Sequence, residues 1–116
     1  MKQVLAIIRP GNYYKTKEAL VEAGFTSMTA KEVLGRGRSS VDFSAKDDSS
    51  GRIIGMELIA KKMLEIYAVD KDVDELVQII LKVNSSGSSG DGKIFVSNVG
   101  NVMRIRTGQT GEDAIL

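Results

Sequence analysis

The stretch KMLEIYAVDKDVDELVQIILKVNSSGSSGDGKIFV, residues 62–96, decides the fold, because it reads as a strand, a helix and a second strand in succession. From Lys62 to Val69 its side chains alternate between two faces, which is the period of a β-strand. The segment that follows has apolar residues at the spacing of one helical face: Val73, Leu76, Val77, Ile80 and Val83. Lys93–Val96 is again strand-like in composition, so a strand–helix–strand unit is predicted.

The first third of the chain predicts a second unit of the same kind. Val4–Ile8 is an apolar run of strand length, and a helix follows from Asn12 and stops at Gly24. Met28–Leu34 then reads as a strand, and Val99–Thr107 as a further short strand near the end. This order predicts an α+β fold, a ferredoxin-like split βαββαβ sandwich.

A long polar segment separates the two units. Residues 35–58 lack periodicity and are rich in serine, glycine and charged residues. Such loops are uncommon in compact domains and are either functional or disordered. Four apolar residues favour a loop that docks onto a partner: Val41, Phe43, Ile53 and Ile54.

Composition limits the classes of function. The chain has 116 residues, 42% of them hydrophobic and 27% charged, which fits one domain spanning 1–116. A net charge of +1 argues against binding nucleic acid by bulk electrostatics. The absence of Cys and His removes thiol and imidazole chemistry and the usual zinc sites, so we expect a binding protein and not an enzyme, with no metal-ligating side chains. Its apolar start is too short for a signal or a membrane span, so a cytoplasmic protein is expected.

One group of residues is suited to binding an anion. The backbone of Gly90-Asp91-Gly92-Lys93 offers N–H groups, and Arg104 and Arg106, two apart in a predicted strand, would point to the same face. A plain turn and a solvated sheet face are the ordinary alternatives. Residues 87–93 fit the start of a P-loop, but Ile94 replaces the hydroxyl residue and a strand follows instead of a helix, so we reject that motif.

With these residues identified, the sequence resembles the PII family of nitrogen-regulatory signalling proteins. The resemblance rests on GDGKIFV at 90–96, RIRTG at 104–108, AIIRP at 6–10, KEAL at 17–20 and GRGR at 35–38. It implies a trimer with ATP or ADP, Mg²⁺ with the ATP, and 2-oxoglutarate in the clefts between subunits. The residues that it assigns to the cleft are Thr29, Gly37, Arg38, Lys61, Glu65, Gly90, Asp91, Gly92, Lys93, Arg104 and Arg106.

The same resemblance makes residues 37–56 a mobile effector loop that docks onto target proteins. Ser39 stands where relatives that bind 2-oxoglutarate have a glutamine, and the loop lacks the tyrosine that some relatives have uridylylated. The long loop is most like the nitrogenase-operon branch, in which two different PII-like subunits assemble and bind dinitrogenase. A partner subunit would then supply the missing glutamine and allow 2-oxoglutarate to bind.

Three other functions stay open at this point. A regulator of an ammonium transporter would use a loop arginine, such as Arg52, to plug the pore. A small nucleotide-dependent phosphotransferase would have only Asp91, Glu65 or Lys61 for chemistry. An RNA-binding module is disfavoured, because Phe95 and Tyr67 are too few aromatic residues for base stacking on the sheet.

Overall fold

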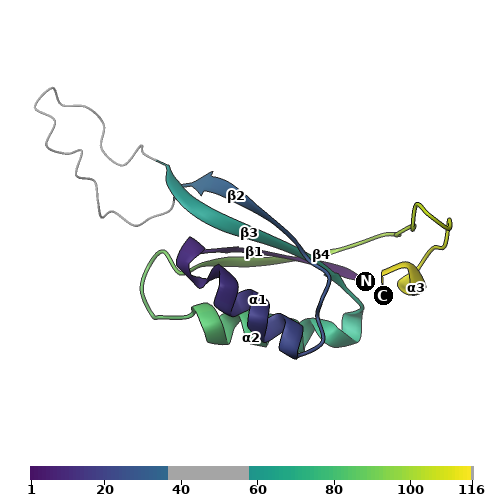
Figure 1. The fold of residues 1–116 in the computed structure, drawn as a ribbon, viewed down its shortest axis with the longest axis horizontal. Coiled ribbons are helices and arrows are strands. Elements are labelled where there is room, and N and C mark those ends of the chain that lie inside the picture. The colour runs from purple at the N-terminus through teal and green to yellow at the C-terminus, as the bar shows by residue number, and fades with distance from the viewer. Residues whose placement is uncertain (37–57, 116) are drawn as a thin grey trace, which may run out of the picture.

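The computed structural model describes residues 1–36 and 58–115, which form a four-stranded sheet covered by two helices (Figure 1). The first unit is β1 (Lys2–Ile8), η1 (Pro10–Asn12), α1 (Tyr13–Glu22) and β2 (Thr29–Gly35). The second unit is β3 (Ile59–Ala68), η3 (Asp70–Asp72), α2 (Val73–Asn84) and β4 (Gly92–Asn98), and a short helix α3 (Glu112–Ile115) follows.

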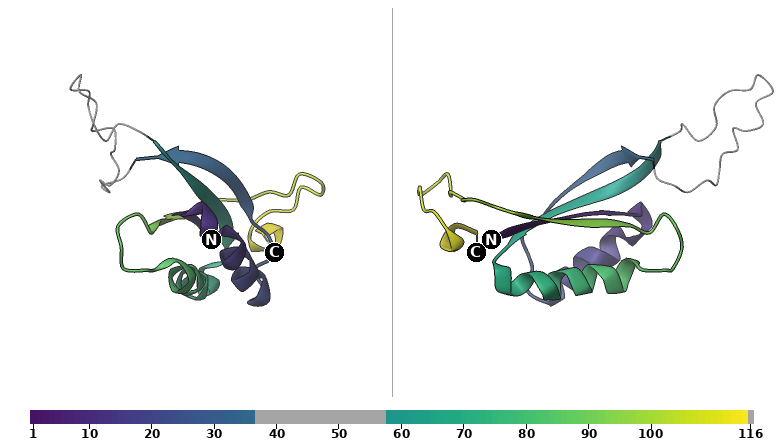
Figure 2. Two further views of the ribbon diagram at one scale, coloured as in Figure 1. Left: turned by 60° about the vertical axis from the view of Figure 1, so that its left-hand side comes forward. Right: turned by 180° about the vertical axis from the view of Figure 1, so that it is seen from behind.

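The sheet is antiparallel throughout, with the strand order β2-β3-β1-β4. Leu5 in β1 lies opposite Glu65 in β3 and Phe95 in β4, and Glu65 in turn lies opposite Thr29 in β2. Both long helices lie on the same side of the sheet, which leaves the other face uncovered (Figure 2). This architecture confirms the predicted ferredoxin-like α+β sandwich.

The core lies between the sheet and the helices. Because side chains alternate along a strand, β1 buries Val4, Ala6 and Ile8 while the residues between them face the uncovered side. Leu64, Ile66 and Ala68 do the same in β3, and Leu20, Leu76 and Ile80 pack against them from the helices. None of the helices in the described ranges is both long and apolar enough to cross a membrane.

A polar contact joins the two helices inside this core. Asn84 at the end of α2 donates from Nδ2 to Thr16 Oγ1 of α1 at 3.0 Å, and Thr16 donates to the Asn12 carbonyl at 2.7 Å. Thr16 is fully buried and Asn84 nearly so. The bonds offset the cost of removing these polar groups from water.

The two units resemble each other residue by residue. Residues 11–20 and residues 71–80, sixty positions further on, show the same succession of exposed, half-buried and buried side chains. Each of these stretches takes in the end of a short 3-10 turn and most of the helix that follows it. The sequence predicts the shared order of elements, but it shows no visible repeat.

The predicted strand at Val99–Thr107 is wrong. Apart from an isolated bridge between Met103 and Thr110, no strand forms there. The chain turns instead, since the N–H of Gly108 donates to the Arg104 carbonyl at 2.7 Å and the N–H of Arg104 donates to the Gln109 carbonyl at 2.8 Å. Gly108 supports the turn with a φ of +73°, a conformation that favours glycine.

Candidate functional site

The glycine-rich connection between α2 and β4, residues 85–91, is held by two cations: Arg9, which directly follows β1, and Lys61 of β3. Arg9 Nη2 lies 3.0 Å from the Ser89 carbonyl oxygen, 3.2 Å from Ser88 Oγ and 3.4 Å from Asp91 Oδ1. Lys61 Nζ donates to the Gly90 carbonyl at 2.8 Å. The pairing of the strands explains this meeting, because both β3 and β4 align with the end of β1.

The Asp91 carboxylate braces the same loop from inside. It accepts from the N–H groups of Ser86 at 2.7 Å and Gly87 at 3.1 Å, and from the Ser86 and Ser88 hydroxyls. The Ser86 bonds lower the pKa of Asp91 to about 2, with Gly87 and Arg9 adding to the effect. Asp91 is thus ionised and turned toward its own loop, so its physical task is to shape the backbone that an anion would meet.

Glycine is required for different reasons at Gly90 in this loop and at Gly92 at the start of β4. A Cβ on Gly90, at a φ of +97°, would lie 3.0 Å from Arg9 Nη2, so its absence leaves room for the guanidinium. A Cβ on Gly92, at a φ of +113°, would lie 1.9 Å from the Ile7 carbonyl oxygen. Gly92 is therefore required for the close approach of β4 to β1, whatever the loop binds.

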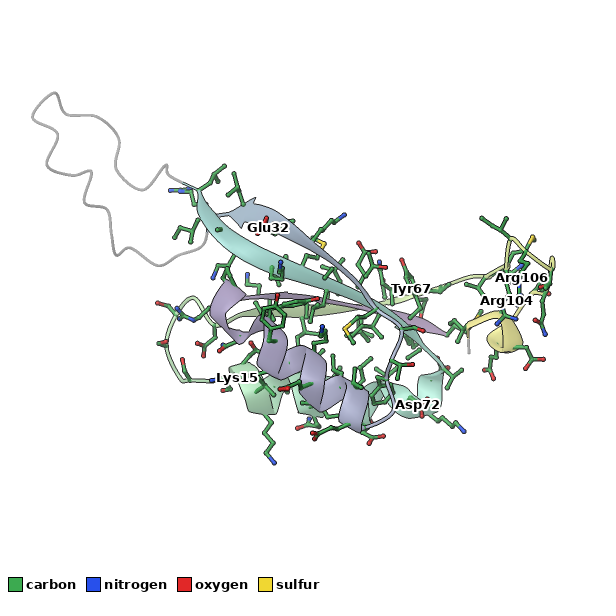
Figure 3. The ribbon with its side chains drawn as sticks, viewed as in Figure 1. Lys15, Glu32, Tyr67, Asp72, Arg104 and Arg106 are labelled. Carbon is green, nitrogen blue, oxygen red and sulfur yellow. The ribbon has the colours of Figure 1, made fainter. Side chains whose placement is uncertain are left out.

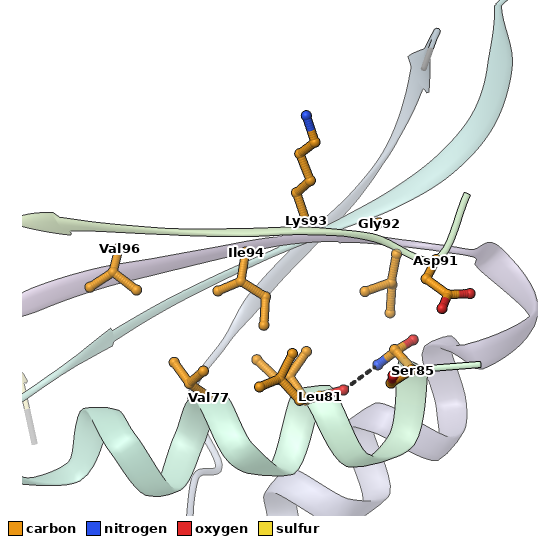
Figure 4. Close-up of a pocket in the computed structure, with 11 residues that line it drawn as sticks. Val77, Leu81, Ser85, Asp91, Gly92, Lys93, Ile94 and Val96 are labelled. Carbon is orange, nitrogen blue, oxygen red and sulfur yellow. Dashed lines mark hydrogen bonds between the residues drawn. The ribbon is translucent and has the colours of Figure 1, made fainter. Parts of the chain in front are cut away.

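Lys61 and Lys93 add positive charge near the loop. Burial, followed by the positive charge of Arg9, lowers the pKa of Lys61 from its ordinary value of 10.5, while Asp91 acts in the opposite direction. Lys93 is exposed on β4 and points away from the helices (Figure 4). A cationic loop with left-handed glycine backbone suits a phosphate or carboxylate ligand.

A second group of predicted residues gathers around a different hollow. Thr29 and Glu65 are direct neighbours on β2 and β3, and with Val102 and Ile115 they line a cavity of about 440 Å³. Glu65 accepts from the Tyr67 hydroxyl at 3.3 Å and pairs with Lys31 at 3.5 Å. This hollow has room for a heterocyclic base and both polar and apolar walls.

The two arginines lie on the side of this second hollow. Arg104 braces the chain after β4, since Nη1 donates to Gln109 Oε1 at 2.7 Å and Nη2 to the Asp113 carbonyl at 3.2 Å. Figure 3 shows Arg104 and Arg106 beyond the end of β4, whereas the glycine loop precedes its start. Because these arginines occupy a turn, the strand alternation that predicted a common face does not apply.

One chain therefore does not bring the glycine loop and the two arginines together. The seven residues of β4 separate them, which is about 20 Å of strand. We call the residues at the glycine loop the phosphate half and those around the Thr29 hollow the base half. The phosphate half comprises Arg9, Lys61, Gly90, Asp91, Gly92 and Lys93. The base half comprises Thr29, Glu65, Arg104 and Arg106.

Several predicted site residues lie outside the described residues. They are Gly37 and Arg38 of the cleft, together with Ser39, Val41, Phe43, Arg52, Ile53 and Ile54 of the long loop. Conversely, the sequence analysis did not assign Arg9 to the site, although it follows a buried strand directly and precedes Pro10. In the described part of the chain, no cluster of three or more acidic side chains is placed to hold a metal ion.

The comparison with protein families assigns the chain. The family described as nitrogen regulatory protein P-II matches residues 1–109. The chain belongs to the P-II family. The family assignment agrees with the resemblance seen in the sequence, and it makes the chain a signalling protein and not an enzyme.

Individual P-II relatives place the chain more closely. It is 43% identical over 122 residues to a nitrogen fixation nifHD region GlnB-like protein 2 of Methanobacterium ivanovii, with 100% of both chains covered. It is 44% identical over 121 residues to the protein of the same name in Methanothermobacter marburgensis, covering 99% of this chain and 100% of that one. These similarities confirm the predicted likeness to the nitrogenase-associated branch.

A solved P-II structure supports the fold. Arabidopsis thaliana PII bound to citrate matches with a TM-score of 0.77 and 31% identity, covering 98% of this chain and 88% of that chain. This similarity confirms that the described part of the chain has the fold of a P-II protein.

Proposed function

We propose that this P-II chain reports nitrogen status by binding, in clefts between its subunits, either ADP or ATP with Mg²⁺ and 2-oxoglutarate. The observation that carries the proposal is the separation of the phosphate half from the base half within one chain. The phosphate half offers the glycine backbone with Lys61, and the base half offers the hollow beside Thr29 and Glu65. A site that needs both halves is completed by a neighbouring copy.

In this arrangement the residues divide the ligand between them. The backbone at Gly90 and the side chains of Lys61 and Lys93 would hold phosphate or carboxylate groups. Asp91 and Arg9 would keep the loop in shape. The base half of the next subunit would supply Thr29 and Glu65 for the nucleoside and Arg104 and Arg106 for the phosphates. The phosphates would carry the Mg²⁺ with them, since no side chain is assigned as its ligand.

The uncovered face of the sheet supports assembly. Its partly or largely exposed side chains include Leu5, Ile7, Met63, Tyr67 and Phe95, with Phe95 51% exposed. Neighbouring apolar side chains of this kind on a soluble domain are typical of an interface. We propose the trimer that the resemblance implies.

The proposed target is nitrogenase. The support is the similarity to proteins named for the nifHD region, and the proposed docking segment is the loop 37–56 with Val41, Phe43, Arg52, Ile53 and Ile54. A second PII-like subunit would supply the glutamine that Ser39 replaces. An ammonium transporter is the alternative target, and affinity capture from native extract separates the two, because recovery of the transporter without dinitrogenase contradicts the proposal.

Complementation between subunits tests the shared site. The variant Lys61→Met disables the phosphate half, and the double variant Arg104→Ala with Arg106→Ala disables the base half. Each should lose ATP and ADP binding by calorimetry, whereas Lys82→Ala, which removes an exposed lysine of α2, should keep it. At about a hundred times the Kd, ATP should stabilise the unaltered protein by about 2.7 kcal/mol in a thermal shift.

Co-expression of the two disabled variants gives the decisive measurement. If each site takes its halves from adjacent subunits that mix at random, about one interface in four combines two intact halves (one half times one half). Nucleotide binding should return to about that fraction of the unaltered protein. Mixed oligomers with no recovered binding would show that the halves do not form one intersubunit site.

A further inference from the structure

A groove runs between α2 and β4 on the helix side of the sheet (Figure 4). Its volume is about 420 Å³, and its walls are largely apolar, with Val77 and Leu81 from the helix facing Ile94 and Val96 from the strand. Leu81 is 43% exposed and Val96 48% exposed. Lys93 points to the other side of β4, so the groove is separate from the face on which that lysine lies.

A buried acceptor without a partner belongs to this groove. Asn84 lines it, and the Asn84 side-chain oxygen Oδ1 has no hydrogen-bond partner among the described residues. Asn84 Nδ2 is turned toward Thr16 on α1 and also donates to the Ile80 carbonyl at 2.9 Å. Since Asn84 lines the groove and its Nδ2 is already engaged by Thr16 and Ile80, Oδ1 is the end of the amide that is left to accept from a ligand. An acceptor left in this state costs about 1–3 kcal/mol until a donor meets it.

The remaining polar groups at this end of the groove also favour a donor. Asp91 and Ser85 lie together there (Figure 4). Asp91 is ionised, so on this side of β4 its carboxylate favours a donor over a second anion. On this side of β4 the polar end of a carboxylate ligand would meet the Asp91 carboxylate and the Asn84 acceptor, which are both unfavourable partners for it.

We propose that the α2–β4 groove binds a small molecule with an apolar body and one terminal N–H or O–H donor, and with no negative charge. The donor meets Asn84 Oδ1, and the apolar body lies between Leu81 and Val96. The groove falls within the range of about 300–1,000 Å³ that is usual for small-ligand sites. One end of the groove adjoins the phosphate half, with which it shares Asp91, Gly92 and Lys93, but its apolar walls lie outside the proposed nucleotide site.

The test uses two probes of similar size and opposite polar ends, added to the assembled full-length protein. Phenethylamine carries only donors at its polar end, and 3-phenylpropionate carries only acceptors. Methyl signals of Val77, Leu81, Ile94 and Val96 in NMR spectra should shift with phenethylamine in a saturable way, with a Kd on the order of 1 mM or below. With 3-phenylpropionate they should not, or the Kd should be at least about tenfold weaker.

Variants locate the binding. Leu81→Lys places a charged chain in the groove and should weaken phenethylamine binding at least about tenfold, while Val21→Lys, at a similarly exposed position of α1, should leave the Kd unchanged. Asn84→Leu should remove the preference for the amine over the carboxylate, and its fold is checked by circular dichroism because Asn84 also binds Thr16. Equal binding of the two probes, or binding that survives Leu81→Lys, would overturn the proposal, as would no binding at all.

Discussion

Replacing Gly92 by alanine should be among the most damaging single-methyl changes in this protein. An added Cβ would lie 1.9 Å from the Ile7 carbonyl oxygen, and the backbone φ of +113° is unfavourable for an L-residue. The conformational penalty alone is about 1–2 kcal/mol. Relieving the contact must move β4 from β1, which gives up sheet hydrogen bonds worth about 0.5–1.5 kcal/mol each. We expect a total loss of about 3–5 kcal/mol in the free energy of unfolding.

Gly87→Ala is the matched control. Gly87 lies in the same connection with a φ of +85°, but nothing lies within 4 Å of an added Cβ. It should cost only the conformational penalty of about 1–2 kcal/mol. For 116 residues, 1 kcal/mol corresponds to about 4 °C in Tm, so urea and thermal unfolding should separate the two variants by roughly 8 °C or more. Equal loss of stability in both would refute the assignment of Gly92 to the β1–β4 contact.

Three further results are expected. The pKa of Asp91 is lowered from 3.8 to about 2, so the hydrogen bonds by which it braces the loop are complete above pH 3.8 and are lost only as the pH falls through about 2. The amide signals of Ser86 and Gly87 in an NMR titration should follow that lower midpoint. Lys61 should titrate below 10.5, and Arg9→Met should raise its pKa without fully restoring it, since burial is the larger cause; a Lys61 pKa unmoved by the variant contradicts this. Thr16→Val should cost about 1 kcal/mol, or about 4 °C in Tm, by removing the acceptor for Asn84; no change would show that the buried bond contributes nothing.

Sequence periodicity was sufficient for the elements that build the core. The apolar face of 73–83 became α2, and the alternation at 62–69 became most of β3, because burial on one side is what these patterns record. Alternation misled at Val99–Thr107, where none of the described strands pairs with the segment and Gly108 turns it back. The alternation of side chains alone does not predict whether a neighbouring strand is available to form hydrogen bonds with the segment.

The site was harder to foresee for a physical reason. The glycine loop and Arg104 are near each other in the sequence but lie at opposite ends of β4. Only the structure shows that Lys61 meets Gly90 while Arg104 lies beyond the other end of that strand. Arg9 was not predicted as a site residue, because a single arginine after a strand belongs to no recognisable sequence motif. Gly92 looked like a loop glycine for ligand contact, yet its missing Cβ is explained by a carbonyl of the neighbouring strand.

The matching burial patterns of residues 11–20 and 71–80 have an evolutionary consequence. If the two strand–helix–strand units descend from one duplicated ancestor, then the connection from α1 to β2 and the connection from α2 to β4 are the same ancestral loop. The first now lines the hollow beside Thr29, and the second became the glycine loop around Gly90. The two parts of the proposed nucleotide site would then be sister copies of a single primitive loop that diverged in chemistry after the duplication.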